Sequence, residues 1–105
     1  MSDSDAMFDG ITSLAERVQD LQRQAAQHYE PTVDQLLRSG SQDAEQIEHT
    51  LDGLLDFCGH EPVLQMFKRL CRHYWDIDPM ATADYVNAYR AQWDSEEHQE
   101  HGEQA

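Results

Sequence analysis

The most regular pattern in the chain is a stripe of apolar residues near its N-terminus. They recur at alternating steps of four and three positions, the heptad spacing that keeps one helix face turned toward a neighbouring helix. β-Branched residues alternate with leucines along it, an order that favours a parallel two-stranded coiled coil. The pattern therefore predicts a long helix that needs an apolar partner. We call this stripe the seam, and it consists of Met7, Ile11, Leu14, Val18, Leu21 and Ala25.

The remaining apolar spacing and the punctuating residues predict further helices and no strands. Pro31 ends the first helix, because the residue before a proline disfavours the helical region, and it suits the first turn of the next helix. Gly40 fits the position after a helix end, and Asp78 followed by Pro79 fits a helix start. We therefore expect an all-α fold, a small helical bundle of about five helices. The predicted helices span 9–28, 31–38, 43–58, 62–75 and 79–93.

The last three predicted helices are joined by short loops, which favours an antiparallel up-down-up unit. Each carries an apolar stripe that predicts its buried side. The seam either docks onto this unit or pairs with a second copy, and the sequence leaves both arrangements open. The predicted core residues are Ile47, Leu51, Leu54, Leu55 and Cys58, then Val63, Phe67, Leu70, Cys71 and Tyr74, then Ala83, Val86, Tyr89 or Arg90, and Trp93.

At 105 residues the chain has room for one domain, which we expect at 7–93. Segments 1–6 and 94–105 are too poor in apolar residues to offset the entropy of ordering, so both are expected to be disordered tails.

The net charge of −14 disfavours direct contact with nucleic acid or an anionic membrane. No apolar run is long enough to span a bilayer, and two cysteines without a signal peptide indicate the cytoplasm.

The predicted helix 43–58 carries acids but no bases. Four of its acids are spaced to form one continuous acidic stripe: Glu45, Glu48, Asp52 and Asp56. The next helix is basic, with Lys68, Arg69 and Arg72. The stripe therefore either complements these bases across the hairpin or faces a basic partner protein.

Metal and catalytic chemistry find little support in the sequence. Cys58 and His60, and likewise Cys71 and His73, form a repeated Cys-x-His pair, but zinc ligands must converge on one ion. The two cysteines are expected to lie too far apart along the helical hairpin for a shared ion or a disulfide. No second helix repeats the Glu45-to-His49 spacing, and no nucleophile motif is present. We therefore expect no enzyme, no metal and no cofactor.

Aromatic residues cluster late in the chain, where Tyr85 and Tyr89 share one helix face and form a possible contact face. The hypothesis that these patterns favour is a non-enzymatic cytoplasmic interaction protein, an adaptor or accessory subunit. We expect it to form a homodimer through the seam. The alternative is an acidic decoy, a nucleic-acid mimic that occupies a basic surface of a nucleic-acid-binding protein.

Overall fold

The protein is described by a computed structural model that covers residues 3–94, with side chains from Phe8 onward. Within this range the chain forms four α-helices and one turn of π-helix, and no strand. The expected all-α helical bundle is confirmed, whereas the expected number of five helices is wrong. The elements are α1 (Asp3–Ser39), α2 (Ala44–Leu55), α3 (Glu61–Trp75), α4 (Pro79–Tyr89) and the π-helix η1 (Arg90–Asp94).

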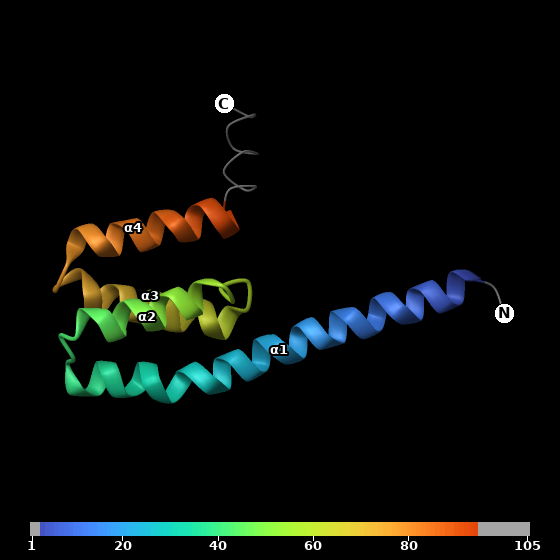
Figure 1. Cartoon of the computed structure of the whole chain (residues 1–105), viewed down its shortest axis with the longest axis horizontal. Helices are drawn as coiled ribbons and strands as arrows, with labels where there is room; N and C mark the ends of the chain where they lie inside the picture. Colours follow the sequence, from blue (N-terminus) through green and yellow to red (C-terminus); the bar gives the residue numbers. More distant parts are fainter. Residues whose placement is uncertain (1–2, 95–105) are drawn as a thin grey trace, which may run out of the picture.

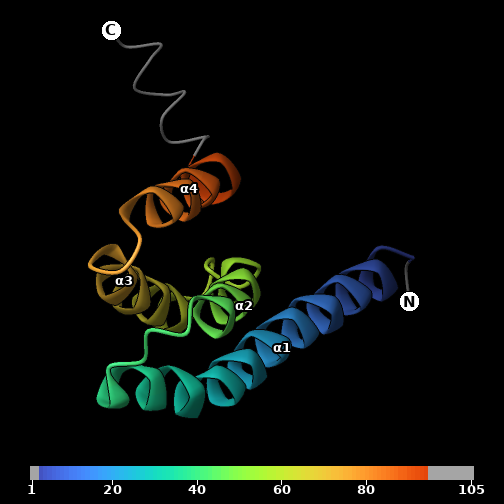
Figure 2. The same ribbon diagram turned by 60° about the vertical axis from the view of Figure 1, so that its left-hand side comes forward.

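Helix α1 joins the two predicted helices 9–28 and 31–38 into one, because Pro31 lies inside a continuous helix. A proline in a helix interior removes one backbone hydrogen bond and crowds the preceding turn, at a cost of roughly 3 kcal/mol. Buried side chains hold the helix on both sides of this defect, Ala25 before the proline and Val33 and Leu36 after it. Figures 1 and 2 show that the helix axis changes direction between its two halves.

Helix α1 also begins earlier than expected, at Asp3. Residues 3–6, predicted as part of a disordered tail, are therefore helical. The predicted C-terminal tail, 94–105, lies outside the described residues except for Asp94, which ends η1.

The helices form layers from which half of α1 protrudes. Helices α2 and α3 lie side by side, the C-terminal half of α1 packs on one side of them, and α4 lies on the other side (Figures 1 and 2). The N-terminal half of α1, residues 3–24, extends away from the other helices, and we call it the arm. The radius of gyration is 17.4 Å, whereas a compact domain of this size has one near 13 Å.

Capping residues fix three of the helix ends, and Gly40 and Asp78 were predicted for two of them. Gly40 has a φ of +60° at the end of α1, where Ser41 N–H donates to Leu36 O at 3.0 Å. This backbone conformation is open to glycine and strained for other residues. The Asp43 carboxylate accepts from Gln46 N–H at the start of α2, and the Asp78 carboxylate accepts from the Ala81 backbone at the start of α4.

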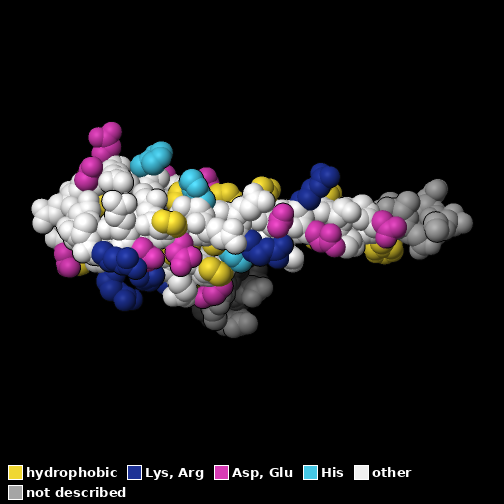
Figure 3. All heavy atoms as spheres, turned by 90° about the horizontal axis from the view of Figure 1, so that it is seen from below, with side chains coloured by type: hydrophobic (Ala, Val, Ile, Leu, Met, Phe, Trp, Pro, Cys, Tyr) yellow, Lys and Arg dark blue, Asp and Glu magenta, His cyan; other side chains and the backbone are white. Residues whose placement is uncertain are grey.

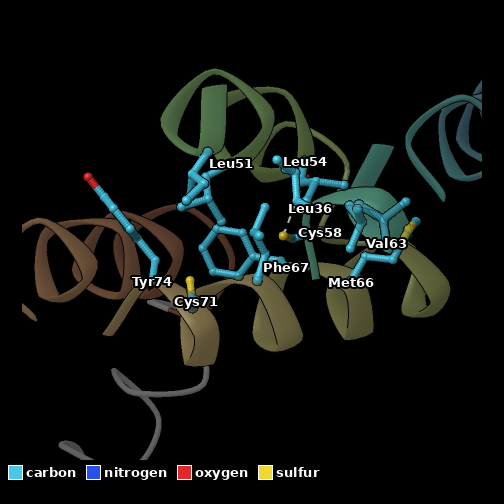
Figure 4. Close-up of a cluster of buried hydrophobic side chains, with 12 residues drawn as sticks. Leu36, Leu51, Leu54, Cys58, Val63, Met66, Phe67, Cys71 and Tyr74 are labelled. Atoms are coloured by element: carbon cyan, nitrogen blue, oxygen red, sulfur yellow. Dashed lines mark hydrogen bonds between the residues drawn. The ribbon is translucent and has the colours of Figure 1, made fainter. Parts of the chain in front are cut away.

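The core lies where α2 and α3 meet each other and the packed half of α1 (Figure 4). The stripes predicted for α2 and α3 are buried, except that Leu55 is half-buried. Within α2, α3 and α4, burial extends to three positions that the predicted stripes did not include, Thr50, Met66 and Thr82. The buried hydrophobic residues are Ala25, Val33, Leu36, Ile47, Leu51, Leu54, Cys58, Val63, Met66, Phe67, Leu70, Cys71 and Tyr74.

Two helices end earlier than predicted, and Trp93 contacts the end of one of them. Helix α2 stops at Leu55 instead of position 58, and α4 stops at Tyr89, after which η1 continues to Asp94. The Trp93 indole N–H donates to Leu55 O at 2.8 Å, across 38 residues of sequence. Its ring fills the space beside Gly59. This tertiary contact, which no local pattern encodes, joins the end of η1 to the end of α2.

Candidate interaction surfaces

The seam lies uncovered on the arm. Leu14 is 62% exposed and Leu21 is 57% exposed, and Ile11 and Val18 are similarly open. Phe8 beside them is also exposed. The side chain of Met7 lies outside the described residues. Along the arm the molecule is a single helix wide (Figure 3), so no other helix of the described chain shelters these residues.

The seam ends where the globular part of the protein begins. Ala25, its last member, is buried, and Tyr29 and Val33 continue the apolar side of α1 into the core. Tyr29 lies against Gly53 of α2, where a larger residue would overlap its ring. One apolar side of one helix is thus covered by the protein's own helices at one end and by nothing at the other.

The acidic stripe on α2 is only partly free. Glu45, Asp52 and Asp56 are exposed, whereas Glu48 is half-buried and accepts a hydrogen bond from the Tyr74 hydroxyl. The expected pairing with the bases of α3 is not found among residues 8–94. Instead Arg69 lies 3.7 Å from the Asp34 carboxylate of α1, measured from Nη2 to Oδ1. The stripe therefore does not serve to join α2 to α3 by ion pairs.

Two tyrosine hydroxyls join the acidic side of α2 to α3 and α4. Tyr74 donates to the Glu48 carboxylate, and Tyr85 donates to the Glu48 backbone oxygen at 3.3 Å. Burial raises the pKa of both tyrosines, and the nearby carboxylates of Glu48 and Asp52 raise it further. These hydroxyls therefore stay protonated and act as hydrogen-bond donors that fix the helices.

The proposed contact face of Tyr85 and Tyr89 is partly used within the protein. Both rings are half-buried and pack against the core. The Tyr89 ring lies 5.8 Å from that of Phe67, centroid to centroid. Part of each ring is thus covered by the protein's own core.

The two thiols are packing groups. Cys58 and Cys71 are free and buried. Burial raises the pKa of Cys58 to about 12, with a further contribution from Cys71, and burial raises the pKa of Cys71 to about 11. A thiol is reactive as its thiolate, so neither side chain is suited to nucleophilic chemistry.

The histidines and cysteines of the Cys-x-His pairs do not form a metal site among the described residues. His73 Nε2 lies 2.7 Å from the Ser41 backbone oxygen, and this hydrogen bond occupies that ring nitrogen. No group of three or more metal-binding side chains comes together within the part of the chain that the structure describes.

None of the helices in the described part combines the length and apolar character needed to cross a membrane.

A groove between α3 and α4 is a surface that the sequence pattern did not predict. Its sides carry the bases Lys68, Arg72 and Arg90, and Trp75 lies at one end. The basic character of the helix 62–75 was visible in the sequence, but Arg90 comes from another element. Only the packing of α3 against α4 brings the three bases to one hollow.

Comparisons with known proteins do not narrow these possibilities. No family model matches the chain, and no curated protein or solved structure is significantly similar to it. The function is therefore argued from the surfaces of the protein itself.

Proposed function

We propose that this chain is a non-enzymatic interaction protein, an adaptor or accessory subunit, that forms a homodimer through the seam on the arm. The observation that carries the proposal is the exposure of Ile11, Leu14, Val18 and Leu21 at heptad spacing. Exposed apolar residues are common singly, but a continuous row of them marks an interaction site. A second copy of the same row has the matching shape and spacing.

The helical state of the arm gives a second argument. An isolated helix shorter than about 12–15 residues is marginal in water even when it is rich in alanine. The arm is longer, but it includes Gly10 and several serine, threonine and aspartate residues, which are weaker helix formers. It also lacks tertiary contacts over most of its length. Pairing of two arms would supply the packing that the rest of the chain does not provide.

The order of residues in the seam favours a parallel pair, and one charge supports this choice. Arg17 flanks the seam. If the arms ran antiparallel with Leu14 opposite Val18, the two Arg17 side chains would face each other across the dimer and repel. In a parallel pair Arg17 instead faces an uncharged glutamine, Gln22. The two globular parts would then lie at the same end of the dimer.

The cellular setting is part of the proposal. The two thiols are free, which suits a reducing compartment such as the cytoplasm. The alternative role as an acidic decoy has weaker support, because Glu48 in the acidic stripe is occupied by Tyr74. That role would require salt-sensitive binding of a basic protein that is lost when Glu45 and Asp52 are replaced by lysine.

Sedimentation velocity at tens of micromolar protein tests the dimer. We expect the parent chain to sediment as a dimer and the double variant Leu14→Glu/Val18→Glu to sediment as a monomer, because it places charges inside the seam. The matched control is Thr12→Glu/Gln19→Glu, which adds the same charge on the opposite face of the arm and should leave the dimer intact. A parent chain that is monomeric at this concentration would refute the proposal.

Circular dichroism gives an independent test of pairing between the arms. Because pairing stabilises the arm, the helical signal of the parent should fall on dilution, while that of Leu14→Glu/Val18→Glu should be lower and independent of concentration. A helical signal that is equal in both proteins at every concentration would show that the arm is helical without a partner.

A further inference from the structure

The groove between α3 and α4 has an apolar floor and encloses about 680 Å³. The floor is made by Leu64, Phe67 and Cys71 of α3 with Val86 and Tyr89 of α4. These residues recur every three or four positions on each helix, so the groove runs along the helix axes. The lining of α3 extends over three turns, which corresponds to roughly 16 Å at the rise of an α-helix.

The sides of the groove are basic in an otherwise acidic protein. Lys68 and Arg72 lie one turn apart on α3, and Arg90 belongs to the other side. All three are exposed, and none forms an ion pair with a described residue. They are three of only seven lysines and arginines in a chain of net charge −14. Asp76 and Asp94 line the groove as its acids.

The groove is separate from the seam. It lies between α3 and α4, and α4 is on the side of the molecule away from α1 (Figures 1 and 2). A dimer formed by the arms would therefore leave the groove open. At one end Trp75 is 54% exposed, which provides a large aromatic surface of the kind enriched at binding hot spots.

We propose that this groove binds an amphipathic, acidic helix of another protein. A groove between two helices, lined at helical spacing, accepts the apolar ridge of a third helix. The bases on both sides would then meet acidic residues on either side of that ridge, which gives charge complementarity. The inference does not depend on the dimer.

The test uses the full-length chain and a fluorescent model peptide. The peptide has about 18 residues, five helical turns, with leucines on one face and glutamates on the others. We expect its fluorescence anisotropy to rise on binding, and the affinity to weaken as salt is added. In the variant Lys68→Glu/Arg72→Glu the dissociation constant should rise by at least about tenfold, because both bases on α3 are reversed.

Two controls distinguish the effect of charge from the effect of where the bases lie. The variant Arg17→Glu/Arg23→Glu reverses two bases on α1 and should bind the peptide as the parent does. A peptide with lysines in place of the glutamates should not bind. Equal affinity of the parent and the Lys68→Glu/Arg72→Glu variant, with the folded state of both verified by circular dichroism, would overturn the proposal, and so would binding of the lysine peptide.

The arm of a second copy is itself an acidic amphipathic helix, so the test must distinguish it. Sedimentation of Lys68→Glu/Arg72→Glu should give the same mass as the parent. A lower mass would identify the arm as the occupant and overturn the assignment to another protein. The seam variant Leu14→Glu/Val18→Glu should keep full peptide affinity, so failure of the dimer proposal and failure of the groove proposal give different results.

Discussion

The two halves of α1 have the same kind of apolar pattern but opposite surroundings. In the packed half Val33 is completely buried by α2 and α3, whereas in the arm Leu14 is 62% exposed. Full burial of such a side chain contributes roughly 1.5–3 kcal/mol. The packed half therefore stabilises the single chain, whereas the exposed apolar side chains of the arm contribute little to its stability. An apolar stripe thus predicts an apolar helix face. It does not indicate whether the chain itself covers that face.

The largest expected effect contrasts one substitution in the two regions. Leu70→Ala in α3 removes a completely buried side chain and should lower the free energy of unfolding by about 2–5 kcal/mol. Leu14→Ala in the arm should change it by less than about 0.5 kcal/mol in protein dilute enough to be monomeric. Urea unfolding at low and high protein concentration measures both. Equal effects at low concentration would show that the arm packs within one chain.

The next effect is a loss of stability at high pH. It concerns only the globular part, because both cysteines lie there. Burial raises the pKa of Cys58 from 9.0 to about 12. The unfolded chain therefore releases this proton first. The free energy of unfolding is unaffected by Cys58 below pH 9 and falls above it, by about 1.4 kcal/mol per pH unit until the folded thiol also ionises.

Urea unfolding at pH 8 and pH 11 measures this slope. The parent should lose roughly 2–3 kcal/mol more than Cys58→Ala between the two values. The pH 8 measurement is the control, since it gives the effect of the side-chain deletion without ionisation. Parallel losses in the two proteins would mean that Cys58 is not shielded from water.

A smaller effect compares two glycines in helices. A methyl group at Gly53 of α2 would overlap the Tyr29 ring of α1, whereas one at Gly10 of the arm would meet no atom within 4 Å. Gly53→Ala should therefore destabilise the fold by about 1–3 kcal/mol. Gly10→Ala should raise the helical signal of the arm, because alanine is favoured over glycine in a helix by about 0.5–1 kcal/mol.

Thermal unfolding and circular dichroism of the two glycine variants check these opposite signs. Destabilisation by Gly10→Ala would indicate that the arm meets a close neighbour at this position in the assembled protein, which would locate the contact along the seam.

The smallest effect concerns helix capping. The Asp78 carboxylate accepts a hydrogen bond from Ala81 N–H at 3.0 Å at the start of α4. Asp78→Ala should lower the free energy of unfolding by about 1 kcal/mol. Asp9→Ala, at an exposed position of the arm, should change it by less than about 0.5 kcal/mol. Chemical denaturation compares them, and a larger effect at Asp9 would contradict the assignment of stability to the globular part.

Much of the fold was predictable because its signals are local. The segment 62–75 was predicted within one residue of α3, and the start of α4 was placed correctly by Asp78 and Pro79. The error at Pro31 has a physical origin. Local preference disfavours a helix there, but burial of Val33 and Leu36 outweighs the local cost. Similarly, the contact of Trp93 with the last residue of α2 was not predictable, because Trp93 is remote in sequence.

The candidate surfaces also differ in how far they could be predicted from local sequence. The heptad spacing of the seam was predictable, because it depends on neighbours within one helix. The exposure of the seam was not, since any of the other helices was a candidate to cover it. The basic groove was not predicted, because Lys68 and Arg90 meet only after α3 packs against α4.

The amino-acid sequence by itself determined the all-α class, most helix limits, the capping residues and the apolar stripes, since each depends on residues within a few positions of one another. The tertiary structure alone decided that α1 continues through Pro31, that Ala25 is buried while Leu21 is not, and that three bases surround an apolar groove. These outcomes depend on which helices meet in space. The packing of the whole chain sets them, and no short segment contains that information.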